Sequence, residues 1–156
     1  MPDARPHTYA PLTYPKGGPR MEIQPYLFFD GSCDEALAFY RSKLGAEVRM
    51  LLRFKDAPAE QAGMAPPGAQ NKVMHARMQI GQTTILVSDG RCGGNPHFQG
   101  MALSLTVATE EEAQRVFTGL SDGGQVQMPL AKTFFSPRFG MLTDRFGVAW
   151  MVYVGS

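Results

Sequence analysis

The feature that most constrains this sequence is a strand pair that recurs in both halves of the chain. Residues His75–Ser88 and Arg138–Val154 each contain two runs rich in aromatic and β-branched residues around a short turn. The turns lie at Gly81-Gln82 and at Asp144–Gly147. Such runs around a glycine-containing break are typical of β-hairpins. Each hairpin follows a predicted helix, and each helix follows a predicted strand, so the chain resembles two copies of one βαβββ unit.

The two predicted helices begin with the same sequence pattern. Ser32 and Glu35 have the S-x-x-E spacing of a capping box, and Thr109 and Glu112 have the T-x-x-E spacing. In a capping box the hydroxyl and the carboxylate accept hydrogen bonds from free amides at the helix start. The first helix is expected over Cys33–Leu44. Because the pattern recurs at the same place in both halves, it supports the duplication.

The predicted fold class is α+β, with two βαβββ units forming curved mixed sheets around a cleft. The units span residues 21–89 and 101–154, and a turn-rich linker at 90–100 joins them within a single domain at 21–154. Residues 1–20 carry five prolines and are predicted to be a leader or an added extension.

Composition excludes several classes of partner. Fifteen basic and fourteen acidic residues leave a net charge of +1, so neither nucleic acid nor an anionic membrane is expected to bind. No apolar run approaches the roughly 18–20 residues of a membrane span. The two cysteines, Cys33 and Cys92, form no CxxC motif and no disulfide framework. We therefore expect a cytoplasmic protein with reduced thiols.

Strand alternation divides the side chains between a helix face and an opposite face. Leu103, Leu105 and Val107 give one wholly apolar face, which should pack on the helices. The opposite face then collects small, hydroxyl and cationic groups, as a ligand cleft would. We predict His75 and Arg138, matched between the two hairpins, as catalytic candidates. The predicted ligand-binding residues are Tyr26, Arg77, Thr84, Ser104, Thr106 and Tyr153.

Three segments of the chain resemble a known family. PYLFFDGSCDEALAFY, VMHARMQIGQTTILVSD and FGMLTDRFGVAWMV are similar to the PhnB-like, or 3-demethylubiquinone-9 3-methyltransferase-like, branch of the glyoxalase/bleomycin resistance/dioxygenase (vicinal oxygen chelate) superfamily. The resemblance covers Met21–Val154. It implies paired βαβββ units that curl into a cleft, usually in a homodimer. For many superfamily members it also implies a divalent metal bound by His and Glu side chains on four strands.

The metal positions of the superfamily carry over to residues that bind metals poorly. In this chain they are Gln24, Leu86, Ala102 and Met151. One neutral amide oxygen cannot hold Zn²⁺, Fe²⁺ or Mn²⁺, so no metal is expected. The open alternative is a rebuilt site that uses His75, Glu22 or a residue of a partner subunit.

The methyltransferase description implies S-adenosylmethionine, which is usually bound by a glycine-rich turn between a strand and a helix. Here the glycines of Gly90–Gly94 are followed by Asn95-Pro96, which is not a helix start. No cofactor is expected.

Three functions remain open from the sequence. The first is a metal-free small-molecule-binding protein that holds a metabolite or antibiotic in each cleft of a homodimer. The alternative is an enzyme of the glyoxalase/dioxygenase-like or demethylubiquinone methyltransferase-like type, with His75 as acid/base and Arg138 as charge clamp. The third is a structural or regulatory dimer with a vestigial cleft, in which these side chains are ordinary solvated residues of the sheet surface.

Overall fold

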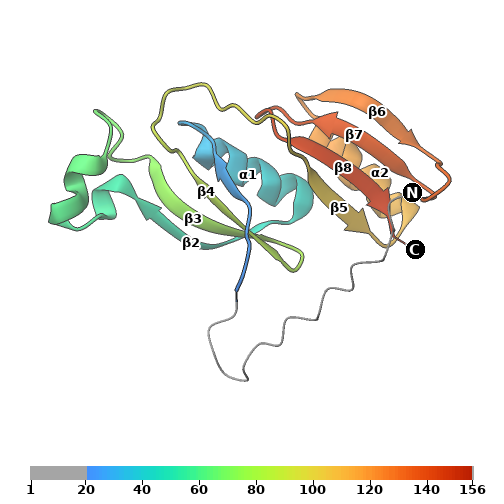
Figure 1. Cartoon of the computed structure of the whole chain (residues 1–156), viewed down its shortest axis with the longest axis horizontal. Helices are drawn as coiled ribbons and strands as arrows, with labels where there is room; N and C mark the ends of the chain where they lie inside the picture. Colours follow the sequence, from blue (N-terminus) through green and yellow to red (C-terminus); the bar gives the residue numbers. More distant parts are fainter. Residues whose placement is uncertain (1–20, 156) are drawn as a thin grey trace, which may run out of the picture.

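The computed structural model describes residues 21–155, so the predicted leader at 1–20 lies outside the described residues. Within these residues, two helices, two short 3-10 helices and eight strands follow one another (Figure 1). In order they are β1 (Tyr26–Phe28), α1 (Cys33–Leu44), β2 (Glu47–Arg53), η1 (Phe54–Asp56), η2 (Ala59–Met64), β3 (Val73–Ile80), β4 (Thr83–Ser88), β5 (Leu103–Val107), α2 (Glu110–Ser121), β6 (Gln125–Ala131), β7 (Phe139–Thr143) and β8 (Ala149–Val154).

The strands form two four-stranded mixed sheets with the same topology. Their orders are β1-β4-β3-β2 and β5-β8-β7-β6, with the first pair of each sheet parallel and the other pairs antiparallel. The register also matches, because Tyr26 lies opposite Leu86 in the first sheet and Ser104 lies opposite Met151 in the second. The predicted α+β fold of two βαβββ units is therefore confirmed. The two sheets remain separate and are not closed on each other.

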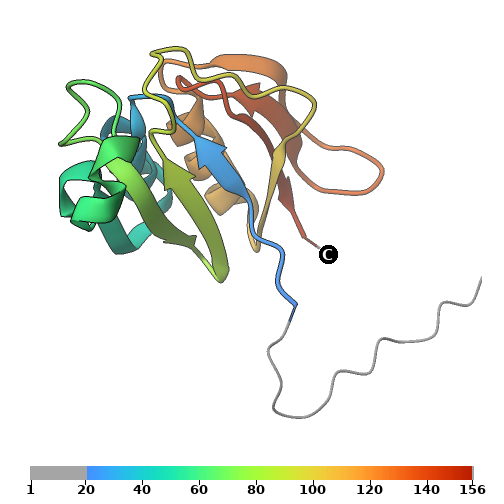
Figure 2. The same ribbon diagram turned by 60° about the vertical axis from the view of Figure 1, so that its left-hand side comes forward.

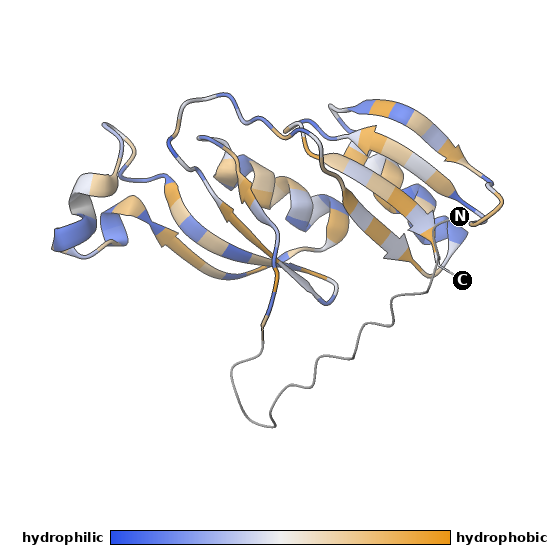
Figure 3. Ribbon diagram, in the orientation of Figure 1, coloured by the Kyte–Doolittle hydropathy of each residue, from blue (hydrophilic) through white to orange (hydrophobic). Residues whose placement is uncertain are grey.

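Both helices lie on the same side of the sheets, where α1 also contacts α2 (Figures 1 and 2). The core fills the space between helices and strands and includes Tyr40, Met78, Trp150 and Val152. Apolar and polar residues alternate along parts of the sheets (Figure 3). Along β8 buried residues alternate with half-buried ones, and the strand buries Trp150, Val152 and Val154. Each fully buried side chain of this size contributes roughly 1.5–3 kcal/mol to the free energy of folding.

No helix within residues 21–155 has the length and apolar character needed to cross a membrane.

The two helix starts are capped by different means. In α2 the predicted capping residue is confirmed, because the Glu112 amide donates to Thr109 Oγ1 at 3.1 Å. In α1 the predicted capping box is wrong: Ser32 Oγ donates to the Phe29 carbonyl oxygen instead. The carboxylate of Asp89, which follows β4, accepts from the amides of Gly31 and Cys33 at 3.0 and 2.8 Å. A residue more than 50 positions away in sequence therefore caps α1.

Asp144 connects the two units through a buried hydrogen-bond network. Its Oδ1 accepts from the amides of Phe146 and Val148, as expected of a turn-forming aspartate. Its Oδ2 accepts from Tyr40 Oη in α1 at 2.5 Å and from Trp150 Nε1 in β8 at 2.9 Å. The second pair of bonds was not foreseen from the sequence, and it joins the helix of the first unit to the final hairpin of the second.

Candidate functional site

The candidate site begins with three ring side chains on the face of the first sheet that points away from the helices. Tyr26 and Phe28 are separated by the buried Leu27 in β1, so both side chains point outward on the same face. Their rings stack, with centroids 4.8 Å apart and planes at 27°. The Tyr26 hydroxyl lies 3.0 Å from Nδ1 of His75 on β3. The structure thus brings together two of the predicted site residues, Tyr26 and His75, and adds Phe28.

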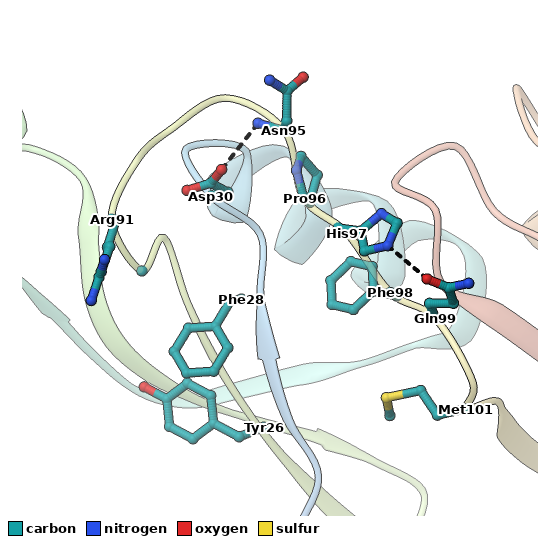
Figure 4. A pocket seen from close by; sticks show the side chains of 11 residues that line it. Tyr26, Phe28, Asp30, Arg91, Asn95, Pro96, His97, Phe98, Gln99 and Met101 are labelled. Carbon is teal, nitrogen blue, oxygen red and sulfur yellow. Dashed lines mark hydrogen bonds between the residues drawn. The ribbon is translucent and has the colours of Figure 1, made fainter.

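A hollow of about 510 Å³ lies beside the Tyr26 and Phe28 rings (Figure 4), whereas His75 is not among the residues that line it. The stacked rings of Tyr26 and Phe28 form one side of it, and the segment between β4 and β5 arcs over the end of the sheet to form the rest. The segment contributes Gly90, Arg91 and the stretch from Asn95 to Gln99, with Met101 beyond it. In Figure 4 the Arg91 side chain lies on one side of the rings, with His97 and Met101 on the other. Small-molecule sites commonly occupy roughly 300–1,000 Å³.

Asp30 fixes this segment. Its carboxylate accepts from the amides of Gly93 at 2.6 Å and Asn95 at 3.0 Å, and its carbonyl oxygen accepts from the Gly94 amide at 2.8 Å. A Cβ at position 93 would lie 2.9 Å from Asp30 Oδ2, so a larger residue there would displace the carboxylate that holds the segment. On the same segment, His97 Nε2 lies 3.0 Å from Gln99 Oε1. The wall of the hollow is therefore built before any ligand arrives.

The other predicted binding residues lie outside the hollow. Arg77 is exposed and Thr84 half-buried in the first sheet. In the second sheet Ser104 and Thr106 are exposed, while Tyr153 is half-buried. None of these five lines the hollow. Their predicted role in ligand binding stays a prediction.

Arg138 does not lie with His75. Its Nε donates to Glu110 Oε2, at the start of α2, at 3.0 Å. In the pairing of β3 with β4, Ala76 lies opposite Val87, and in the pairing of β7 with β8, Gly140 lies opposite Val152. The residue that matches His75 is therefore Phe139, and the predicted match to Arg138 is wrong by one position. A one-residue slip moves a side chain to the other face of a sheet, which is why Arg138 points to the helix side.

The donor set at the four superfamily metal positions does not fit a metal ion. Gln24, Leu86, Ala102 and Met151 supply at most one amide oxygen and one thioether. Of the residues in the rebuilt alternative, Glu22 Oε1 accepts from Gln24 Nε2 at 2.7 Å, and His75 Nδ1 lies 3.0 Å from the Tyr26 hydroxyl, so the two contact different neighbours. Within residues 21–155 no group of three or more His, Cys, Asp or Glu side chains is arranged to hold a metal.

The residues around Gly90–Gly94 likewise do not fit S-adenosylmethionine. The amides of Gly93, Gly94 and Asn95 already donate to Asp30. The element that follows is β5, so no helix start faces the glycines. We derive no step through this cofactor.

Cys33 stands at the first turn of α1, where helix amides can lower the pKa of a thiol. Here burial, followed by the nearby Asp89 carboxylate, raises the thiol pKa instead. Cys33 therefore stays protonated near neutral pH and is not an activated nucleophile.

The fold is that of the glyoxalase/bleomycin resistance/dioxygenase superfamily. A domain of this superfamily from Frankia sp. EAN1pec aligns with a TM-score of 0.59 at 16% identity, over 89% of this chain and 98% of that one, which shows the fold alone. A sequence profile described as 3-demethylubiquinone-9 3-methyltransferase matches residues 21–153. The chain belongs to this family, as its resemblance to the PhnB-like branch predicted.

Three relatives illustrate the family. Protein YjdN of Escherichia coli strain K12 is 35% identical over 140 residues, which cover 86% of this chain and 95% of YjdN. The crystal structure of protein PA1353 from Pseudomonas aeruginosa is 40% identical with a TM-score of 0.75, covering 87% and 98% of the two chains. The PhnB protein from Bacillus cereus is 31% identical with a TM-score of 0.72, covering 86% and 100%.

The sequence did not predict that the linker lines the site. The linker at 90–100 is interpreted from its sequence as a simple connection between the units. It contains Arg91 and His97, and Met101 follows it directly. The available signal was that this linker mixes its glycines with basic and aromatic residues, which a plain connection does not need.

Proposed function

We propose that this protein is a metal-free small-molecule-binding member of its superfamily, which holds a metabolite or antibiotic in the hollow beside β1. The observation that supports the proposal is the exposed Tyr26–Phe28 stack, which faces a hollow of about 510 Å³. Exposed aromatic rings in a concave, preformed site offer apolar area at low entropic cost. The absence of the usual metal ligands at positions 24, 86, 102 and 151 favours binding over metal-assisted chemistry.

Isothermal titration calorimetry of the full chain against metabolite and antibiotic panels tests the proposal. Phe28→Ala should weaken any ligand found by about tenfold or more, because it removes ring contact inside the hollow. Phe134→Ala is a matched control, since that ring is fully exposed and lies outside the hollow. Equal affinities of wild type and Phe28→Ala would place the ligand elsewhere and contradict the proposal.

A catalytic role is the second candidate, because the Tyr26 hydroxyl and His75 form a pair at 3.0 Å that could exchange a proton with a bound ligand. Turnover assays on glyoxalase-, dioxygenase- and methyltransferase-type substrates test it. His75→Ala should lower the rate of any reaction found by roughly 100-fold. An unchanged rate would remove His75 from that role.

We also propose that residues 21–154 act as one domain and that the protein is a cytoplasmic homodimer. The bond between Tyr40 and Asp144, which links the two units, supports the single domain. Apolar side chains left exposed on the strands and loops, such as Val126, Met128 and Phe135, support self-association. Sedimentation equilibrium tests the dimer, and a mass equal to one chain at micromolar concentration would contradict it.

A further inference from the structure

We infer that the hollow selects flat aromatic compounds that carry an acidic group. The inference deepens the proposed function, on which it rests, by naming the chemical class of the ligand. It comes from the different characters of the side chains around the hollow.

The aromatic requirement comes from the rings beside the hollow. Phe28 is 56% exposed and Tyr26 is 37% exposed, although both belong to a strand whose other face is fully buried. Figure 4 shows their rings next to each other at the edge of the hollow. Met101 lies across from them and is 48% exposed. A planar ring would bury this area by stacking on the aromatic rings and contacting the methionine sulfur, both of which are favourable arrangements.

The acidic requirement comes from Arg91, which lines the hollow on the side of the Tyr26 hydroxyl (Figure 4). Within residues 21–155 Arg91 has no ion-pair partner, whereas Arg53, Arg138 and Arg145 each pair with a carboxylate. A guanidinium beside a hydroxyl can bind a carboxylate through charge-assisted hydrogen bonds.

The one carboxylate in the wall does not satisfy Arg91. Asp30 directs both oxygens to the amides of Gly93 and Asn95, at 2.6 and 3.0 Å. Its charge is thereby held within the linker, and Arg91 remains the cation available to a ligand. Aromatic character on the ring side and positive charge on the Arg91 side match an aromatic acid better than a sugar or an aliphatic chain.

Three probes separate the two requirements. 2-Naphthoate carries both the ring and the acid, 2-naphthamide replaces the acid by a neutral group of the same shape, and cyclohexanecarboxylate carries the acid without an aromatic ring. Calorimetry or ligand-detected NMR on the full chain should show 2-naphthoate binding at least about tenfold more tightly than either of the others.

Arg91→Gln should abolish the preference for naphthoate over naphthamide, while Arg115→Gln on the outer surface of α2 should keep it. Phe28→Leu should weaken both naphthalene compounds, and Phe134→Leu should not.

Each contrary outcome has one meaning. Equal binding of naphthoate and naphthamide, or a preference that survives Arg91→Gln, overturns the acidic requirement while leaving the proposed function standing. Equal binding of cyclohexanecarboxylate overturns the aromatic requirement. Failure of all three probes to bind overturns the whole inference, and the wider ligand panel then decides the proposed function independently.

Discussion

Asp144 shows how one side chain can serve both a turn and the joint between two units. The carboxylate accepts four hydrogen bonds, two from its own turn and two from Tyr40 and Trp150. A carboxylate has enough lone pairs to accept all four, and a buried polar group stabilises the fold only when its partners are satisfied. Position 144 therefore requires a side chain that accepts hydrogen bonds at both of its terminal atoms, which a carboxylate does.

Asp144→Asn should lower the free energy of unfolding by about 3 kcal/mol, because the amide nitrogen would face N–H donors whichever way it turned. Urea denaturation measures the change. Asp122→Asn is the control, since water screens its ion pairs with Lys43 and Arg145. Similar stability of the two variants would contradict the role assigned to Asp144.

At the scale of the elements, α1 depends on a distant carboxylate for its start. Asp89 Oδ1 bonds the amides of Gly31 and Cys33, and its Oδ2 bonds the Val73 amide at 2.7 Å. One side chain thus ties the helix start to the beginning of β3 and to the end of β4. The linker that walls the hollow leaves the sheet directly after this residue.

Asp89→Asn should destabilise the protein by about 2 kcal/mol, because its amide group would oppose one of the three backbone donors. Ser32→Ala should cost less than about 1 kcal/mol, since the Phe29 carbonyl still accepts from the Ser32 amide at 3.1 Å. Thermal and urea unfolding compare the two variants. A larger effect at Ser32 than at Asp89 would restore the capping box expected from the sequence.

Strand β7 packs so closely against α2 and β6 at Gly140 that this position has no room for a side chain. A Cβ at Gly140 would lie 2.7 Å from the Phe117 ring of α2 and 3.0 Å from the Met128 carbonyl oxygen of β6. Gly140→Ala should therefore destabilise the protein by about 2 kcal/mol, as overpacking usually does. Gly63→Ala, where nothing lies within 4 Å of the added Cβ, is the control. Equal unfolding midpoints of the two variants would show that β7 can move aside.

For the whole molecule, two buried protonated groups make stability depend on pH in the alkaline range. Burial, with Asp89 and Asp144 nearby, raises the pKa of Cys33 and of Tyr40 above their ordinary values of 9.0 and 10.0. The unfolded chain releases these protons at the ordinary values, whereas the folded chain keeps them. The stabilisation is therefore fully present below pH 9 and is lost as pH rises further.

The free energy of unfolding should fall above pH 9 with a slope of up to about 1.4 kcal/mol per pH unit for each group. Cys33→Ala should make the fall shallower, because only the wild type holds that buried thiol proton. Urea titrations between pH 8 and 11 measure both slopes. Identical slopes would mean that Cys33 ionises in the folded protein.

The sequence by itself determined the fold, because hydrophobic alternation, helix periodicity and turn residues are local properties that repeat in both units. It placed both helices and the hairpins, and strand alternation put Tyr26 and His75 on one face. Contacts between distant residues could not be obtained this way. The capping of α1 by Asp89, the bond from Tyr40 to Asp144 and the one-residue shift that turns Arg138 to the helix side depend on how separate segments meet. The hollow beside β1 likewise exists only because the folded linker returns over the sheet, where hydrogen bonds to Asp30, more than 60 residues earlier in the chain, hold it.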